Sequence, residues 1–161
     1  MEKKIEILRE LEKNGRISIS ELASISNVCE DEINQILYDL EKEHIICGYS
    51  ALINRDKTSN EVVTAIIEVK VKPQIESGFD EIANKISKLD EVNSIYLMSG
   101  NFDLMIMIEG KTVKEISAFV YEKLSGFDSI ISTSTHFVLK KYKDHHIFIT
   151  KNKKKRMLIG A

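Results

Sequence analysis

Apolar residues recur with a helical period at the start of the chain. The first series comprises Ile5, Leu8 and Leu11. Ile7 lies alongside them, charged side chains fill the other face and Asn14-Gly15 ends the series, so the spacing predicts an amphipathic helix. Ser18 or Ser20 can then cap a second, short helix. The apolar residues of this second helix are Leu22, Ala23 and Ile25.

A tight turn and a third helix follow. Ser26-Asn27-Val28 is the predicted turn, because asparagine is among the few residues other than glycine that adopt left-handed backbone angles at low cost. The third helix has its apolar face on Ile33, Ile36, Leu37 and Leu40. Three short helices with a tight turn between the second and the third predict a helix-turn-helix module, which binds the DNA major groove.

The pattern changes in the second half of the chain. Residues 45–53 are apolar and β-prone, and the polar stretch 54–60 is typical of a linker. Strand and helix periods alternate beyond it. The predicted segments are strand 62–71, helix 79–88, strand 92–98, strand 102–108, helix 113–124 and strand 130–139. The order β-α-β-β-α-β predicts a ferredoxin-like domain.

We therefore expect an α+β protein with four regions. They are a winged-helix-like helix-turn-helix domain (1–53), a linker (54–60), a ferredoxin-like effector-binding and oligomerisation domain (61–150) and a basic tail (151–161). Both helices of the second domain must pack on one face of its sheet. The other face is left for a partner subunit, and a homodimer is the economical way to cover it.

Composition narrows the class of protein. The chain has 161 residues, 43% of them hydrophobic, which suits one medium domain or two small ones. Its longest apolar stretches are far shorter than the roughly 20 residues that span a bilayer, and no apolar signal region follows Met1. We expect a cytoplasmic protein without a cofactor. Cys29 and Cys47 lack the CxxC spacing of metal or redox sites and are expected to be buried free thiols.

Several ordered segments resemble the Lrp/AsnC family of transcription regulators. They are ILRELEKNGRISISELA, LEKEHIICGYSALIN, MSGNFDL and STSTHFVLKKYK, and the resemblance extends from about Ile5 to Lys143. It implies a DNA-binding domain followed by a domain that forms dimers and higher oligomers. It also implies that a small effector, commonly an amino acid, binds near a G-x-x-D turn, which here is Gly100 to Asp103.

The residues that the resemblance assigns to the effector have suitable chemistry. They are Ser99, Gly100, Asn101, Asp103, Thr133 and Thr135. Glycine lets a ligand approach the backbone, free N–H groups can hold a carboxylate, and Asp103 can accept hydrogen bonds from an ammonium group. Thr133 and Thr135 alternate on one side of a strand. The alternative interpretation is an ordinary hairpin turn, with threonines that simply suit a strand.

The predicted DNA-binding module is acidic. Residues 1–48 contain six lysines and arginines against eleven acidic residues, a difference of minus five, and none of the six lies between Asn27 and Glu41. Gln35 and Tyr38 occupy positions where the family commonly has basic residues, and His44 replaces its usual glycine. The candidate DNA-binding residues are Arg16, Ser26, Asn27, Asn34, Gln35, Tyr38 and Lys42. We expect DNA binding that is weak per subunit and sensitive to salt.

Other features leave alternatives open. The module could have lost its DNA affinity, in which case the protein would be a ligand-binding or protein-interaction module of the same fold. The basic run 151–156 could contact DNA, or it could be a solvated tail. Asp144-His145-His146 suggests a metal, but neighbouring residues of a strand point to opposite faces, so we expect none. The sequence contains no recognised catalytic motif, so we do not expect an enzyme.

Overall fold

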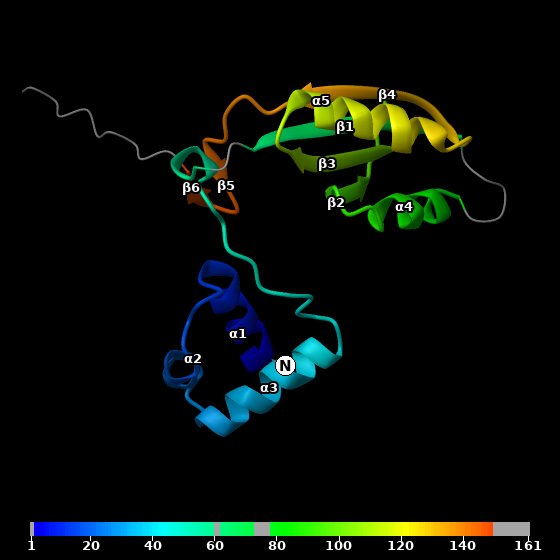
Figure 1. Cartoon of the computed structure of the whole chain (residues 1–161). Coiled ribbons are helices and arrows are strands. Elements are labelled where there is room, and N and C mark those ends of the chain that lie inside the picture. Colours follow the sequence, from blue (N-terminus) through cyan, green and yellow to red (C-terminus); the bar gives the residue numbers. More distant parts are fainter. Residues whose placement is uncertain (1, 60–61, 73–77, 150–161) are drawn as a thin grey trace, which may run out of the picture. The chain divides into compact units, whose positions relative to one another are not determined.

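The computed structural model describes residues 2–59, 62–72 and 78–149. The chain divides into two compact units, Met1–Ile53 and Asn54–Ala161, called the N-terminal and C-terminal units below (Figure 1). Residue 60 of the predicted linker, residues 61, 73–77 and 150 of the predicted second domain, and the whole basic tail 151–161 lie outside the described residues.

The N-terminal unit consists of three helices, as predicted (Figure 1). They are α1 (Glu2–Lys13), α2 (Ile19–Ser26) and α3 (Glu30–Lys42). Their core is small: the clustered buried residues are Ile7, Leu22, Ala23 and Ile33. Ser18 is the residue that caps α2, and it forms a reciprocal capping box with Glu21.

The turn between α2 and α3 has the left-handed residue that the sequence predicts. Asn27 has φ 51° and ψ 52°, and the backbone N–H groups of Asn27 and Val28 both donate to the carbonyl of Ala23. His44 also has a positive φ of 54°, just beyond α3. Glycine adopts such angles without strain, so the positive φ of His44 is consistent with the glycine that the resemblance implies at this position.

Residues 45 and 46 form a bend and residues 47–53 are irregular, so this segment is not a strand, contrary to the β-prone pattern. A strand needs a neighbour for its backbone hydrogen bonds, and the described part of this single chain supplies none here. A short 3-10 helix, η1 (Arg55–Lys57), follows. Both cysteines are exposed, so the expectation of buried thiols was wrong. Cys29 is the N-cap residue of α3, and the thiol of Cys47 donates to the carbonyl of His44.

The C-terminal unit has the predicted ferredoxin-like topology. Its elements are β1 (Val63–Val71), α4 (Asp80–Ser87), β2 (Val92–Leu97), β3 (Leu104–Gly110), α5 (Val113–Ala118) and β4 (Ile130–Phe137). The sheet order is β2-β3-β1-β4, and all three strand pairs are antiparallel (Figure 1). β1 lies in the middle of the sheet and pairs with both β3 and β4.

One face of this sheet is covered by helices. Alternate residues of β1 and β3 are buried against side chains of both α4 and α5. Each fully buried valine, leucine or isoleucine side chain among them stabilises the fold by about 1.5–3 kcal/mol. The core of twelve buried residues is Ala65, Ile67, Val69, Val71, Ile82, Ile86, Leu104, Ile106, Ile108, Ile116, Phe119 and Leu124. The opposite face has half-buried apolar residues, among them Ile66, Met105 and Met107.

Two features differ from the sequence prediction. The helix predicted over 113–124 changes its winding: α5 is followed by the π-helical η2 (Phe119–Lys123) and the 3-10 helix η3 (Leu124–Gly126). A hairpin of β5 (Lys143–Asp144) and β6 (Ile147–Phe148) follows β4. His145 and His146 form its turn, with φ 41° and 63°, so they do not alternate on a strand as we expected.

Candidate functional site

The candidate DNA-binding residues of α3 share one exposed face. Asn34, Tyr38 and Lys42 follow one another at intervals of four residues, and Gln35 lies beside them. Tyr38 has 59% of its surface exposed. Arg16, in the turn between α1 and α2, is exposed as well. The fold therefore leaves these five side chains accessible to a partner.

Several polar groups of α3 already have partners within the chain. The amide of Gln35 donates to Asp39 Oδ1 at 3.0 Å, and Lys3 Nζ lies 3.4 Å from Glu32 Oε1. Lys42 Nζ lies 6.0 Å from the centre of the Tyr38 ring. The carboxylates of Asp39 and Glu32 thus partly occupy the few groups that could contact DNA. A phosphate must compete with these carboxylates.

Ser26 does not fit its predicted role. Only 6% of its surface is exposed, and its hydroxyl is buried with no hydrogen-bond partner among the described residues. A buried hydroxyl is not accessible to a phosphate, because α2 packs Ser26 against the core. Its neighbour Asn27 is exposed and keeps a side chain that can reach a partner.

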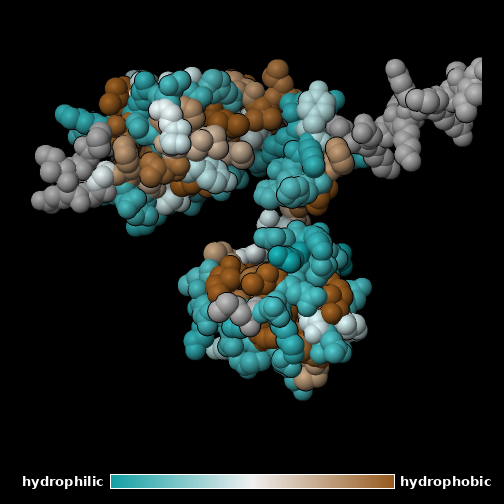
Figure 2. All heavy atoms as spheres, turned by 180° about the vertical axis from the view of Figure 1, so that it is seen from behind, coloured by the Kyte–Doolittle hydropathy of each residue, from teal (hydrophilic) through white to brown (hydrophobic). Residues whose placement is uncertain are grey.

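Exposed apolar side chains accompany the polar ones on the N-terminal unit (Figure 2). Ile25, at the end of α2, has 46% of its surface exposed. The sequence pattern placed Ile25 with the apolar residues of α2 and gave no role to it at a binding surface. Apolar side chains contact the methyl group of thymine in the major groove, so the exposed Ile25 is a further candidate for DNA contact.

Hydrogen bonds at the start of α2 fix its direction. The backbone N–H and the hydroxyl of Ser18 both donate to Glu21 Oε2, at 3.0 and 2.9 Å, and the Glu21 N–H donates back to the Ser18 hydroxyl at 3.1 Å. The bonds from Ser18 lower the pKa of Glu21, since they favour its charged form. The capping box therefore prefers an ionised Glu21.

The predicted effector turn closes the hairpin between β2 and β3. The Met98 N–H donates to the carbonyl of Asp103 at 2.8 Å. Gly100 has φ 154°, which disfavours any residue with a side chain. Ser99, Gly100 and Asn101 are all exposed. The turn thus presents accessible backbone groups, as the prediction requires.

Asp103 has a structural role that the sequence did not indicate. Its Oδ2 accepts the backbone N–H of Val71 at 2.8 Å, and its own N–H donates to the carbonyl of Val69 at 3.0 Å. Val71 lies at the irregularity of β1, where the pairing with β4 shifts register. The carboxylate therefore fastens the effector turn to the end of β1, and one of its oxygens is already engaged.

Thr133 and Thr135 lie on the other side of β1. They pair with Val69 and Ile67, so both threonines face the same side of the sheet as these core residues, and both are half-buried. Asp103 and Thr133 flank Val69 from opposite strands, so their backbones are separated by about two strand spacings, roughly 10 Å. The structure places the turn and the two threonines at one part of the sheet, on either side of β1.

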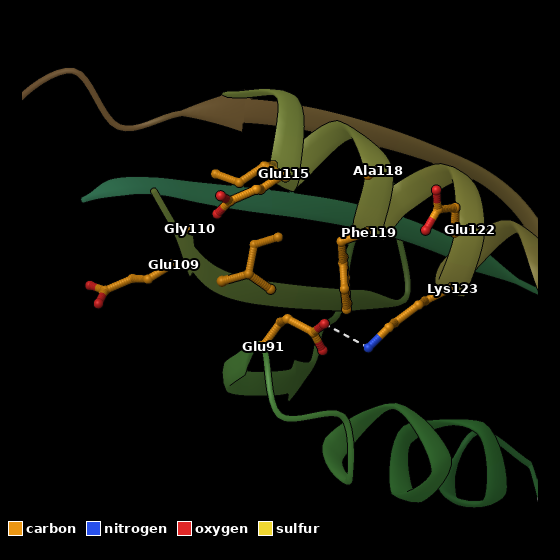
Figure 3. Close-up of a pocket in the computed structure, with 10 residues that line it drawn as sticks. Glu91, Glu109, Gly110, Glu115, Ala118, Phe119, Glu122 and Lys123 are labelled. Atoms are coloured by element: carbon orange, nitrogen blue, oxygen red, sulfur yellow. Dashed lines mark hydrogen bonds and ion pairs between the residues drawn. The ribbon is translucent and has the colours of Figure 1, made fainter. Parts of the chain in front are cut away.

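A cavity of about 320 Å³ lies elsewhere in the C-terminal unit, between α5, η2 and β3 (Figure 3). Its apolar part includes Ile108, Ile116 and Phe119. None of the six predicted effector residues lines this cavity. The cavity is therefore separate from the site that the sequence predicts.

Charged groups surround this cavity. Lys123 Nζ lies 2.6 Å from Glu91 Oε1, and Figure 3 shows the two side chains pointing toward each other. The bond from Lys123 lowers the pKa of Glu91. Glu115 Oε2 accepts the Lys111 N–H at 2.8 Å, and Glu109 points away from the cavity (Figure 3). These contacts are internal to the unit and fix its helices on the sheet.

A three-helix module with an exposed third helix, followed by a ferredoxin-like domain, defines a two-domain DNA-binding regulator. The sequence model of a winged helix-turn-helix DNA-binding domain matches residues 2–46, and that of the Lrp/AsnC ligand binding domain matches residues 64–148. The chain belongs to the Lrp/AsnC family. It is a DNA-binding transcription regulator whose second domain responds to a small effector.

Relatives match over nearly the whole chain. The HTH-type transcriptional regulator YugG of Bacillus subtilis is 44% identical over 99% of this chain and 97% of its own. A transcriptional regulator of Neisseria meningitidis, solved in complex with L-Met, has a TM-score of 0.70 at 25% identity and covers 89% of this chain and 92% of its own. Escherichia coli AsnC has the same fold, with a TM-score of 0.64 at 23% identity, over 88% and 93% of the two chains.

The described residues contain no helix long and apolar enough to cross a membrane.

Proposed function

We propose that the effector is an amino acid that binds at the turn 99–103 together with Thr133 and Thr135. The exposed, glycine-dependent turn carries this proposal, because its backbone groups are accessible to a carboxylate. The two threonine hydroxyls face one side of the sheet and can contact the same ligand. The relative from Neisseria meningitidis, which was solved with L-Met, supports an amino acid as the chemical class.

The protein acts as a homodimer that assembles further. The sheet face opposite α4 and α5 supports this assembly, because it carries Ile66, Met105 and Met107 half-buried and Tyr96 with 50% of its surface exposed. The same face of a second copy, related to the first by a twofold axis, would cover these side chains. Several modules in one assembly also offset the weak DNA affinity of each.

The N-terminal unit contacts double-stranded DNA through α3. Asn34 and Gln35 are suited to read adenine edges, Asn27, Arg16 and Lys42 to hold phosphates, and Tyr38 to contact the groove. The acidic groups of α3 keep this binding weak and salt-sensitive. The protein has no catalytic role, and it acts in the cytoplasm, where its DNA partner lies.

Two measurements test this function. A thermal-shift screen of the twenty amino acids should find at least one that raises the melting temperature of the C-terminal unit, and substituting Thr133 and Thr135 by valine should abolish that rise. Titration of promoter fragments at several salt concentrations should show binding that weakens steeply with salt. Absence of a stabilising amino acid would contradict the effector class, and absence of DNA binding at low salt would contradict the role of α3.

A second function is favoured by one observation. The amide of Gln35 and the ammonium of Lys3 are held by carboxylates of the same module. A ligand-binding or protein-interaction module without useful DNA affinity would have these contacts. Effector binding in the screen, without DNA binding in the titration, would select this alternative.

A further inference from the structure

The positive charge of the chain is concentrated at its C-terminal end. The sequence has 23 lysines and arginines and 25 acidic residues; residues 138–161 hold eight of the former and one of the latter. The net charge of residues 138–161 is therefore plus seven. Residues 1–137 hold the other 15 lysines and arginines and 24 acidic residues, a net charge of minus nine. A polyanion that approaches the protein is attracted to this end and repelled by the rest.

Residues 138–149 are the described part of this region. They include the hairpin β5–β6, and residues 140–148 are called the basic hairpin below. Lys140 Nζ lies 5.0 Å from the centre of the Tyr142 ring, and Lys143 Nζ lies 5.2 Å from that of Phe148. Both rings are 65% exposed. An ammonium group over an exposed ring is attracted by the ring and stays open to solvent on its other side.

The acidic groups near the hairpin are paired with other residues. Asp144 Oδ1 lies 3.0 Å from His145 Nδ1, and Glu109 Oε1 lies 3.5 Å from Lys141 Nζ. Among the described residues, no carboxylate lies within ion-pair distance of Lys140 or Lys143. These two ammonium groups differ from Lys3, which Glu32 holds in the N-terminal unit.

We infer that the basic hairpin is a second DNA-contacting element, which binds backbone phosphates through Lys140 and Lys143. This inference rests on the DNA binding of the regulator and extends it. The acidic α3 surface supplies sequence-reading groups but few cations, whereas affinity for DNA comes largely from phosphate neutralisation. The hairpin supplies these cations, and its two-residue turn places Lys143 and Phe148 opposite each other in the strand pairing.

The test compares full-length variants by fluorescence anisotropy with a labelled random-sequence duplex at several salt concentrations. K140Q/K143Q removes the two hairpin cations. K88Q/K114Q is the matched control, since it removes two exposed lysines of the same unit, one just after α4 and one in α5. We expect K140Q/K143Q to reduce the slope of log Kd against log salt by about two and to weaken binding roughly 10- to 30-fold near physiological salt. The control should leave both values unchanged.

Further arms separate this inference from the role of α3. Q35A should change the preference for a promoter fragment over the random duplex without changing the salt slope. Equal slopes for K140Q/K143Q and its control would overturn the hairpin contact while leaving α3 intact. Loss of affinity together with a change in mass by light scattering would overturn it too, because the hairpin would then be an assembly surface. Binding to phosphatidylglycerol vesicles but not to the duplex is a third contrary result.

Discussion

The two units of this protein differ in how their folds are stabilised. The C-terminal unit buries twelve clustered apolar residues between a sheet and two helices, whereas the core cluster of the N-terminal unit has four. A unit with so small a core depends more on its turns and caps, such as the capping box of Ser18. We therefore expect local substitutions to unfold the N-terminal unit, which reads DNA, more easily than the C-terminal unit, which binds the effector.

Equivalent core truncations should separate the two units most strongly. I33A and I106A each remove three carbons from a fully buried side chain and should cost about 2–5 kcal/mol. That loss should unfold the N-terminal unit at room temperature, while the C-terminal unit should stay folded at a lower melting temperature. Calorimetry of the full chain measures both transitions. A single shared transition in both variants would contradict the independence of the units.

Substitutions of Asp103 test how its carboxylate acts. It either holds the effector turn to β1 through a hydrogen bond or presents its charge to the ligand. D103A leaves the Val71 N–H without its partner and should cost about 1–3 kcal/mol. D103N retains an oxygen that accepts this bond, so we expect it to keep most of the stability and of the amino-acid affinity. Denaturant unfolding and calorimetric titration with the amino acid found in the screen provide the two readouts.

A loss of amino-acid affinity in D103N would instead support the contact between Asp103 and an ammonium group that the sequence predicts. If D103N loses the amino acid as completely as D103A, the charge of Asp103 contacts the ligand's ammonium group directly. Amide exchange of Val71 is an independent check, since it should accelerate in D103A whether or not a ligand is present.

The capping box should give the N-terminal unit a pH dependence of its own. S18A should destabilise α2 by about 1 kcal/mol, since it removes an N-cap. The bonds from Ser18 lower the pKa of Glu21 in the folded state. The associated stability is therefore fully present above the ordinary glutamate pKa and is lost as the pH falls through the lower, folded value. Urea unfolding of the wild type and S18A from pH 7 to pH 3 should show this loss only in the wild type.

His44 provides the smallest and most local test. Its φ of 54° favours glycine, so H44G should stabilise the end of α3 by about 0.5 kcal/mol, after the greater flexibility of glycine in the unfolded chain is subtracted. H44A, which keeps a side chain at this position, serves as the control and should not stabilise. Thermal unfolding followed by circular dichroism is sensitive enough for both.

The sequence predicted those features that depend on local backbone chemistry and periodicity. Ser18 as one of two candidate caps, Asn27 as the left-handed turn residue and the β-α-β-β-α-β order of elements follow from residue types and spacing, and the structure has all three. The family followed from the resemblance of several ordered segments to the Lrp/AsnC regulators, and the order of elements alone would not have given it. Local patterns sufficed here because each feature is decided within a few residues.

Features that depend on distant contacts were not predictable in this way. The N–H that Asp103 binds belongs to β1, and the β-prone segment 45–53 has no partner strand in the described chain. Ser26 looked accessible in a turn, but packing of α2 buries it. The sequence also gave no sign that the Asp144-His145-His146 stretch bends back as a hairpin.

The central position of β1 has a consequence for biosynthesis. Both of its neighbours, β3 and β4, come later in the chain, so β1 cannot complete its hydrogen bonds until nearly the whole second unit has left the ribosome. The core cluster of the N-terminal unit is built from residues of its own three helices, which can therefore form earlier. The nascent chain therefore acquires its DNA-reading unit first, and control by an effector becomes available only when β4 closes the sheet.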